Sequence, residues 1–172
     1  MTKSKLFISV LILSFLAGCS NYKVGHLMHP QIKTIGFGKI LNKTDQPRLS
    51  LYMMEKLKER FMQDASIKVV ASDKADVILT GIVTDTKISS RGRTHQDDRE
   101  KNEGFFATIF SADLTFEYEV KTRKGWDVLK GKVTEGADFT ELIDQHEEKK
   151  NALQRAAYEV SKKVVVEITE AW

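Results

Sequence analysis

The only cysteine of the chain, Cys19, stands at the end of a short apolar segment, where its thiol can be modified covalently. The segment starts with a lysine-containing head, continues as an apolar run over residues 6–16 and closes with the small residues Ala17 and Gly18. This order of basic, apolar and small residues is typical of a secretory signal that is cut after the small pair. The apolar run is too short to cross a bilayer as a helix, which takes roughly 20 residues. We therefore predict a cleaved signal peptide over residues 1–18.

The tetrad Leu16-Ala17-Gly18-Cys19 resembles the lipobox of bacterial lipoproteins. This resemblance implies that the Cys19 sulfur carries a diacylglyceryl group and that the new N-terminus carries a further acyl chain. Two or more acyl chains anchor a protein stably, since each buried methylene contributes about 0.8 kcal/mol. The alternative is an ordinary buried thiol in an uncut signal anchor. By the same resemblance, Ser20 in place of an aspartate implies sorting to the outer membrane, at its periplasmic face.

The rest of the chain has the size of one domain. Removal of residues 1–18 leaves 154 of the 172 residues, of which residues 19–31 are expected to form a lipidated tether. Residues 32–172 then suffice for a single domain with one core. The signal holds two of the 27 basic residues and none of the 24 acidic residues, so 25 basic and 24 acidic side chains remain. This near-neutral balance argues against a nucleic-acid-binding protein.

Hydrophobic patterning predicts a strand over residues 32–37 and a helix that begins near Pro47. A short second strand is predicted over residues 67–71, and a third strand, rich in Val, Ile and Thr, over residues 77–90. The helix carries an apolar stripe with a four-residue spacing, made of Leu49, Met53, Leu57 and Phe61.

Strict alternation in the third strand places Ile78, Ile82 and Ile88 on the same face. The segment that follows, residues 91–104, has no large apolar residue. We predict that it is a solvated loop between two strands.

The most regular alternation of apolar and polar residues runs from 112 to 121, which is the period of a strand with one buried face. A turn at residues 122–125 and a strand over residues 126–134 complete an antiparallel hairpin. A polar loop to residue 142 precedes a long closing helix that starts near Asp144. The order β-α-β-β-β-β-α predicts an α+β fold. In this two-layer α/β sandwich, two helices pack on one face of a mixed, mainly antiparallel sheet.

The motifs, taken in order, resemble the lipopolysaccharide-assembly lipoproteins of the LptE family over nearly the whole chain after residue 18. One departure is that Ser20 and Asn21 separate the cysteine from Tyr22, where the family often has Gly-Tyr. The matching motifs are Tyr22-Lys23-Val24-Gly25, Ile32-Lys33-Thr34-Ile35, Asn42-Lys43-Thr44, the helix from Pro47, Ala75-Asp76-Val77-Ile78-Leu79-Thr80-Gly81 and the helix that ends at Trp172.

This resemblance implies a role without catalysis. Members of the family sit inside the outer-membrane β-barrel LptD as its plug and assembly partner, and they help to deliver lipopolysaccharide to the outer leaflet. The phosphates of lipopolysaccharide pair well with the forked guanidinium group of arginine. We hypothesise that the contacts to this phosphorylated glycolipid come from Arg91, Arg93, Arg123 and Lys124. The sequence leaves open whether the two pairs lie at the same end of the domain, and the alternative is that all four are solvated turn charges.

Other residues have competing interpretations. The lysines Lys121, Lys130 and Lys132 extend the second basic pair in sequence. A run of large apolar residues is a candidate contact for the barrel or else part of the core, and consists of Phe105, Phe106, Ile109 and Phe110.

Two groups that contain histidine have the spacing of possible metal ligands. His26 and His29 have no Cys or carboxylate nearby in sequence, and His95 with Asp97 and Asp98 lies in a charged segment without a rigid second shell. We predict no metal site. The chain also lacks nucleophile-elbow, phosphate-loop and dinucleotide motifs. We therefore expect neither an enzyme nor a cofactor beyond the lipid on Cys19.

A second class of function also fits the sequence. Oligomeric structural lipoproteins of secretion or polysaccharide-export pores likewise begin with a lipid anchor and use small α/β sandwiches. The two classes differ in oligomeric state, because a plug is expected as a monomer bound to one barrel and a pore subunit as a large ring.

Overall fold

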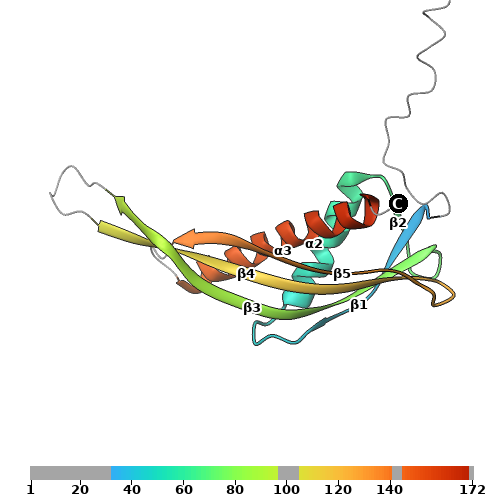
Figure 1. Ribbon diagram of the computed structural model, residues 1–172, viewed down its shortest axis with the longest axis horizontal. Helices are drawn as coiled ribbons and strands as arrows, with labels where there is room; N and C mark the ends of the chain where they lie inside the picture. The colour runs from blue at the N-terminus through green and yellow to red at the C-terminus, as the bar shows by residue number, and fades with distance from the viewer. Residues whose placement is uncertain (1–31, 97–104, 141–144, 171–172) are drawn as a thin grey trace, which may run out of the picture.

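The computed structural model describes residues 32–96, 105–140 and 145–170 (Figure 1). The predicted signal, the tether and Cys19 lie outside the described residues. Within them the chain forms a five-stranded sheet with two helices on one face, and the expected order β-α-β-β-β-β-α is confirmed. The elements are β1 (Thr34–Asn42), α2 (Leu49–Asp64), β2 (Lys68–Val69), β3 (Val77–Gln96), β4 (Phe105–Thr122), β5 (Asp127–Thr140) and α3 (Gln145–Glu170).

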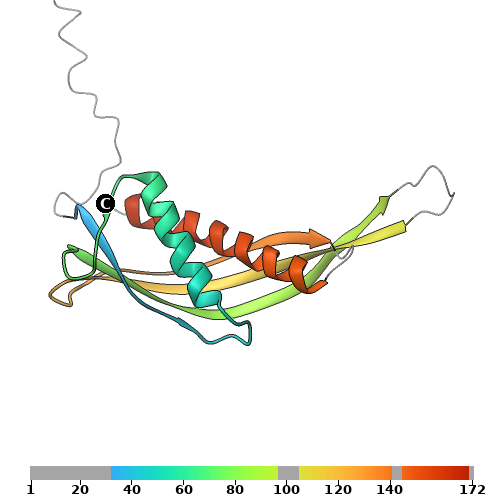
Figure 2. The ribbon, with the colours of Figure 1, turned by 180° about the vertical axis from the view of Figure 1, so that it is seen from behind.

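The strands lie in the order β2-β1-β3-β4-β5. β1 runs parallel to both β2 and β3, whereas β3, β4 and β5 are joined antiparallel. The parallel pairing of β1 with β3 is possible because α2 provides the crossover between them. Figure 2 shows both helices lying across the same face of the sheet. The predicted mixed, mainly antiparallel two-layer fold is therefore confirmed.

Helix α2 buries the stripe predicted from its four-residue spacing. Leu49, Met53, Leu57 and Phe61 are all fully buried. The helix begins two residues later than Pro47, after Arg48, which has a left-handed backbone with φ 66° and no side-chain capping bond. The preceding turn is held instead by Asn42, whose side chain accepts from Thr44 and donates to the backbone of Gln46.

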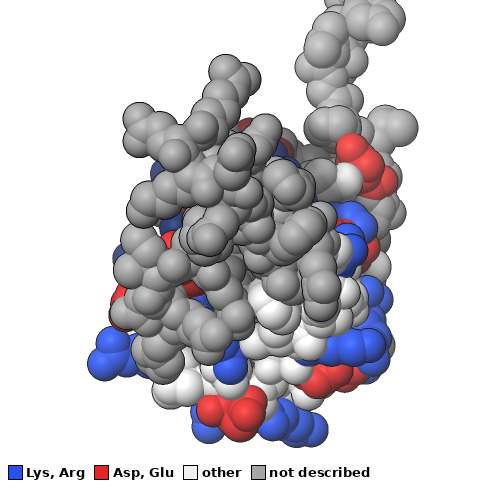
Figure 3. Space-filling model, turned by 90° about the vertical axis from the view of Figure 1, so that its left-hand side faces the viewer, with Lys and Arg blue, Asp and Glu red and all other residues white. Residues whose placement is uncertain are grey.

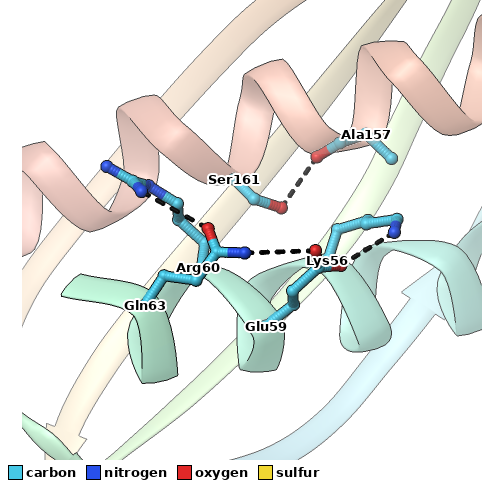
Figure 4. A network of polar contacts seen from close by, with 6 residues as sticks. All are labelled: Lys56, Glu59, Arg60, Gln63, Ala157 and Ser161. Atoms are coloured by element: carbon cyan, nitrogen blue, oxygen red, sulfur yellow. Dashed lines mark hydrogen bonds and ion pairs between the residues drawn. The ribbon is translucent and has the colours of Figure 1, made fainter. Parts of the chain in front are cut away.

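Helix α3 packs against the sheet and against α2 through a buried face with many small residues, among them Ala152, Ala156 and Ala157. Ser161 lies on this buried face and satisfies its hydroxyl within the helix, by donating to the Ala157 carbonyl at 2.7 Å. Polar side chains of α2 beside this helix form a chain of contacts (Figure 4). Lys56 pairs with Glu59 at 2.8 Å, Gln63 donates to Glu59 at 3.3 Å, and Arg60 donates to Gln63 at 3.5 Å.

Tyr118 joins the sheet to α3. It pairs with Gly81 on one side and Gly131 on the other, and its ring fills the space above Gly131, where an added Cβ would lie 2.5 Å from it. Its hydroxyl donates to a Glu167 carboxylate oxygen of α3 at 2.6 Å. Burial, followed by the bond to this carboxylate, raises the pKa of the phenol far above its ordinary value.

The prediction of a solvated loop over residues 91–104 is wrong for residues 91–96, and residues 97–104 lie outside the described residues. β3 continues to Gln96 and β4 begins at Phe105, so the two strands form a hairpin arm that extends beyond the helices (Figures 1 and 2). Antiparallel backbone bonds do not depend on apolar side chains, so a polar segment can pair in a two-stranded arm. The predicted loop before the last helix is shortened in the same way, because β5 pairs with β4 up to Thr140.

The predicted grouping of Ile88 with Ile78 and Ile82 is also wrong. The register of β3 against β4 shifts between Val83 and Asp85, which inserts one extra residue. A bulge of this kind reverses which face the later residues occupy. Ile88 therefore pairs with buried Ala112 on the helix face, while Ile78 and Ile82 remain on the helix-free face of the sheet.

Candidate binding sites at the two ends of the sheet

The four basic residues proposed to contact phosphate do not form one site. Arg91 and Arg93 lie in the hairpin arm, and Arg123 and Lys124 lie in the β4–β5 turn beside the start of β3. Fourteen strand positions separate Val77 from Arg91. At about 3.3 Å per residue this amounts to roughly 45 Å. The two pairs therefore occupy opposite ends of the sheet.

Arg91 is the extra residue of a second bulge, between Ser90 and Gly92. Its guanidinium is held on the helix-free face by two carboxylates, with Nη2 3.5 Å from Asp113 Oδ1 and Nε 3.3 Å from Asp138 Oδ1. Basic and acidic side chains are also interspersed over the described surface seen from the arm end (Figure 3). A phosphate that binds Arg91 must therefore compete with acids already in place.

The other arm residues are placed mainly by their backbone pairing. Arg93 lies opposite Thr108. Phe105 and Phe106 pair with Gln96 and His95 near the end of the arm.

Within the run of large apolar residues, Ile109 and Phe110 lie closer to the helices than Phe105 and Phe106 do. Phe110 stacks on Phe139 with ring centroids 5.5 Å apart and packs against the core, and Ile109 is half-buried. The run is therefore divided, because Phe110 belongs to the core edge while Phe105 and Phe106 lie further out.

Lysines on the helix-free face are paired with acids of the same or the neighbouring strand. Lys132 lies 3.0 Å from Glu117, and Lys130 lies 3.0 Å from Glu119, which Lys121 also contacts at 2.6 Å. The hydrogen bond from Lys121, and then that from Lys130, lowers the pKa of the Glu119 carboxyl. Lys130 and Lys132 border a groove of about 750 Å³ that crosses β1, β3, β4 and β5. Their charge is neutralised within the sheet, so they do not extend the basic pair in the turn.

The β4–β5 turn has a fixed shape. Gly125 adopts φ 86°, a left-handed conformation that suits glycine, and donates its N–H to the Thr122 carbonyl at 2.8 Å. The backbone N–H of Trp126 donates to the Thr122 hydroxyl at 3.1 Å. Arg123 and Lys124 are exposed at the tip of this turn, and within the described ranges neither makes an ion pair.

The turn borders a groove of about 630 Å³. Trp126 lines it and is 72% exposed, the highest value among the exposed large apolar side chains of the described residues. Ile32, where the described chain begins, lines the same groove. The remaining walls come from the starts of β3 and β5 and from the turn, with Ala75, Asp76, Val77, Thr122, Arg123, Lys124, Asp127 and Val128.

The two acids of this groove already have partners. One Asp76 oxygen accepts from the Lys33 and Thr34 N–H groups and the Thr34 hydroxyl at 2.8–3.0 Å. The bond from the Lys33 N–H is the main cause that lowers the pKa of Asp76, and the charge of Arg123 adds to it. Asp127 pairs with Lys121 and Lys130 at 3.7 and 3.0 Å. Arg123 and Lys124 are thus left as cations that can meet an external anion.

Sequence reasoning missed Trp126 as a functional candidate and placed it only as a strand start. The available signal was a tryptophan that directly follows a turn with two basic residues. The part of the chain that the structure describes contains no helix long and apolar enough to span a membrane. In the same residues no three His, Cys, Asp or Glu side chains are grouped for a metal ion.

No protein-family model and no curated protein sequence matches the chain. Among solved structures, protein XCC0632 from Xanthomonas campestris, of family model DUF330, matches with a TM-score of 0.55 and 12% identity, over 83% of this chain and 88% of that one. A PelC dodecamer from Paraburkholderia phytofirmans gives 0.49 at 12% identity, over 83% and 92%. Rare lipoprotein B from Shewanella oneidensis gives 0.36 at 13% identity, over 79% and 92%. The similar structures thus include proteins described as lipoproteins, and the chain shares its fold with XCC0632.

Proposed function

We propose that the chain is a lipid-anchored outer-membrane lipoprotein, the plug and assembly partner of an LptD-type β-barrel, which binds lipopolysaccharide and aids its delivery to the outer leaflet. The observation that carries the proposal is the lipobox at Cys19 followed by one domain in which the predicted element order is found. The role is one of binding and assembly, without a catalytic step.

The hairpin arm is the element best suited to contact the barrel. It extends beyond both helices, so neither helix covers it (Figure 1). Phe105 and Phe106 lie in it near its end. The same arm holds Arg91 and Arg93, which we propose as contacts for a glycolipid phosphate near the barrel.

Co-purification tests this function. The lipidated protein is extracted from native outer membranes in mild detergent, sized, and its partners are identified. We expect a one-to-one complex with a much larger β-barrel, with lipopolysaccharide in the same fraction. A variant with Cys19→Ser is the control, because without the lipid it should be absent from the outer-membrane fraction.

The outcome that contradicts the proposal is a large homo-oligomer without a barrel. That result would favour the second class of function, an oligomeric structural lipoprotein of a secretion or polysaccharide-export pore.

A further inference from the structure

We propose that the β4–β5 turn is a membrane-docking site, at which Arg123 and Lys124 bind the anionic headgroups of the bilayer that anchors the protein while Trp126 enters the headgroup region. The inference rests on the proposed lipid at Cys19. It assigns this end of the domain to the membrane surface, and it leaves the opposite arm for lipopolysaccharide and the barrel.

The position of the chain start argues for this occupant. Ile32 lines the groove beside the turn, and Cys19 lies 13 positions before it in sequence. Thirteen residues span at most about 45 Å when fully extended. An acylated Cys19 therefore holds Ile32, and the turn beside it, within about 45 Å of the bilayer, whereas the arm lies roughly 45 Å further along the sheet.

The side chains of the turn match the chemistry of a headgroup layer. Tryptophan is enriched at membrane interfaces because its ring is apolar and its N–H is polar. An anionic surface attracts each nearby Lys or Arg. Trp126, Arg123 and Lys124 lie within four consecutive positions of one fixed turn, and the acids beside them are already bonded to other groups. The exposed side chains of Trp126, Arg123 and Lys124 do not belong to the buried core of the described residues.

Fluorescence of Trp126 tests the docking directly. The chain has two tryptophans, so Trp172→Phe leaves Trp126 as the only reporter. The full lipidated protein is reconstituted into vesicles of phosphatidylcholine alone, or of phosphatidylcholine with phosphatidylglycerol, each with brominated acyl chains as quencher. We expect stronger quenching in the anionic vesicles, reduced by added salt because salt screens exposed charges.

Removal of the two cations gives the quantitative test. Arg123→Ser with Lys124→Ser should lower the ratio of docked to undocked protein by about 30-fold, given the usual contribution of a basic residue near an anionic surface. Lys43→Ser with Lys87→Ser is the matched control, because both lysines are exposed and lie along the sheet away from the turn. In the control variant, the brominated lipids should quench Trp126 fluorescence as strongly as in the parent.

Three results would overturn the inference: no quenching of Trp126, equal quenching in neutral and anionic vesicles, or unchanged quenching in the double variant. Shielding of Trp126 only when the barrel is present would also overturn it, in favour of a protein partner. Flotation of the protein with the vesicles distinguishes failure of the docking inference from failure of the proposed lipid anchor. A protein that floats with vesicles but leaves Trp126 unquenched refutes the docking alone, and one that does not float refutes the lipid on Cys19.

Discussion

Asp76 holds the start of β1 against the start of β3 with a single carboxylate oxygen. That oxygen accepts from two backbone N–H groups and one hydroxyl, and the Asp76 N–H donates to the Thr34 hydroxyl at 2.9 Å. These bonds favour the ionised form and lower the pKa of Asp76 in the folded protein. A carboxyl whose pKa is lower in the folded than in the unfolded state stabilises the fold above its unfolded pKa, about 3.9, and loses this contribution as the pH falls through its folded pKa.

We predict that Asp76→Asn lowers the free energy of unfolding by about 1 kcal/mol at neutral pH, which is below the usual range for hydrogen bonds to a charged group because the site is exposed. The difference from the parent should shrink when the pH is lowered from 7 to 3. Urea unfolding at both pH values measures it. Asp73→Asn, an exposed change in the same polar turn, should have little effect at either pH. A constant difference between Asp76→Asn and the parent would contradict this assignment.

At the residue scale, the sequence located the basic residues but not their partners. Arg91 meets Asp113 and Asp138, which lie 22 and 47 positions later on the two neighbouring strands, because the pairing of β3, β4 and β5 brings the three residues together. No local pattern encodes such a contact. Trp126 was within reach of prediction, whereas the groove beside it forms only when Ile32 is brought back to the same end of the sheet.

At the scale of elements, two glycines of β3 provide a matched test of the packing. A Cβ on Gly81 would lie 2.2 Å from Cζ of Phe116, a fully buried ring, and 2.9 Å from the backbone oxygen of Glu117. A Cβ on Gly92 would have no atom within 4 Å. We therefore expect Gly81→Ala to destabilise the fold by about 1–3 kcal/mol. Gly92→Ala should change stability by less than about 0.5 kcal/mol.

Thermal unfolding of the two glycine variants and the parent measures the difference. Equal stability of Gly81→Ala and Gly92→Ala would show that β3 does not lie against Phe116 as described. Because both changes add the same methyl group to the same strand, intrinsic strand preference cannot explain a difference between them.

The elements themselves were largely predictable, for physical reasons that differ along the chain. The stripe of α2 and the alternation of β4 follow from burial of one face, and both are confirmed. The arm was missed because residues 91–96 carry no large apolar side chain, so the sequence has no pattern of burial there, and the two strands are joined by backbone pairing. The face of Ile88 was missed because strict alternation fails at a bulge, which one extra residue creates without a sequence signature.

At the scale of the whole molecule, the sheet separates the two proposed binding sites. The chain enters beside the β4–β5 turn, and the hairpin arm extends from the opposite end (Figures 1 and 2). An anchor before Ile32 therefore leaves the arm free to reach a partner at a distance of roughly 45 Å from the turn. This division is the reason that membrane docking and barrel binding need not compete for the same surface.

Mass spectrometry of the N-terminal peptide, taken from protein purified out of native membranes, tests the lipid anchor on which both proposals depend. The account predicts a chain that starts at Cys19 and carries a diacylglyceryl group on its sulfur and an acyl chain on its nitrogen. An unmodified Cys19, or a chain that still contains residues 1–18, would contradict it.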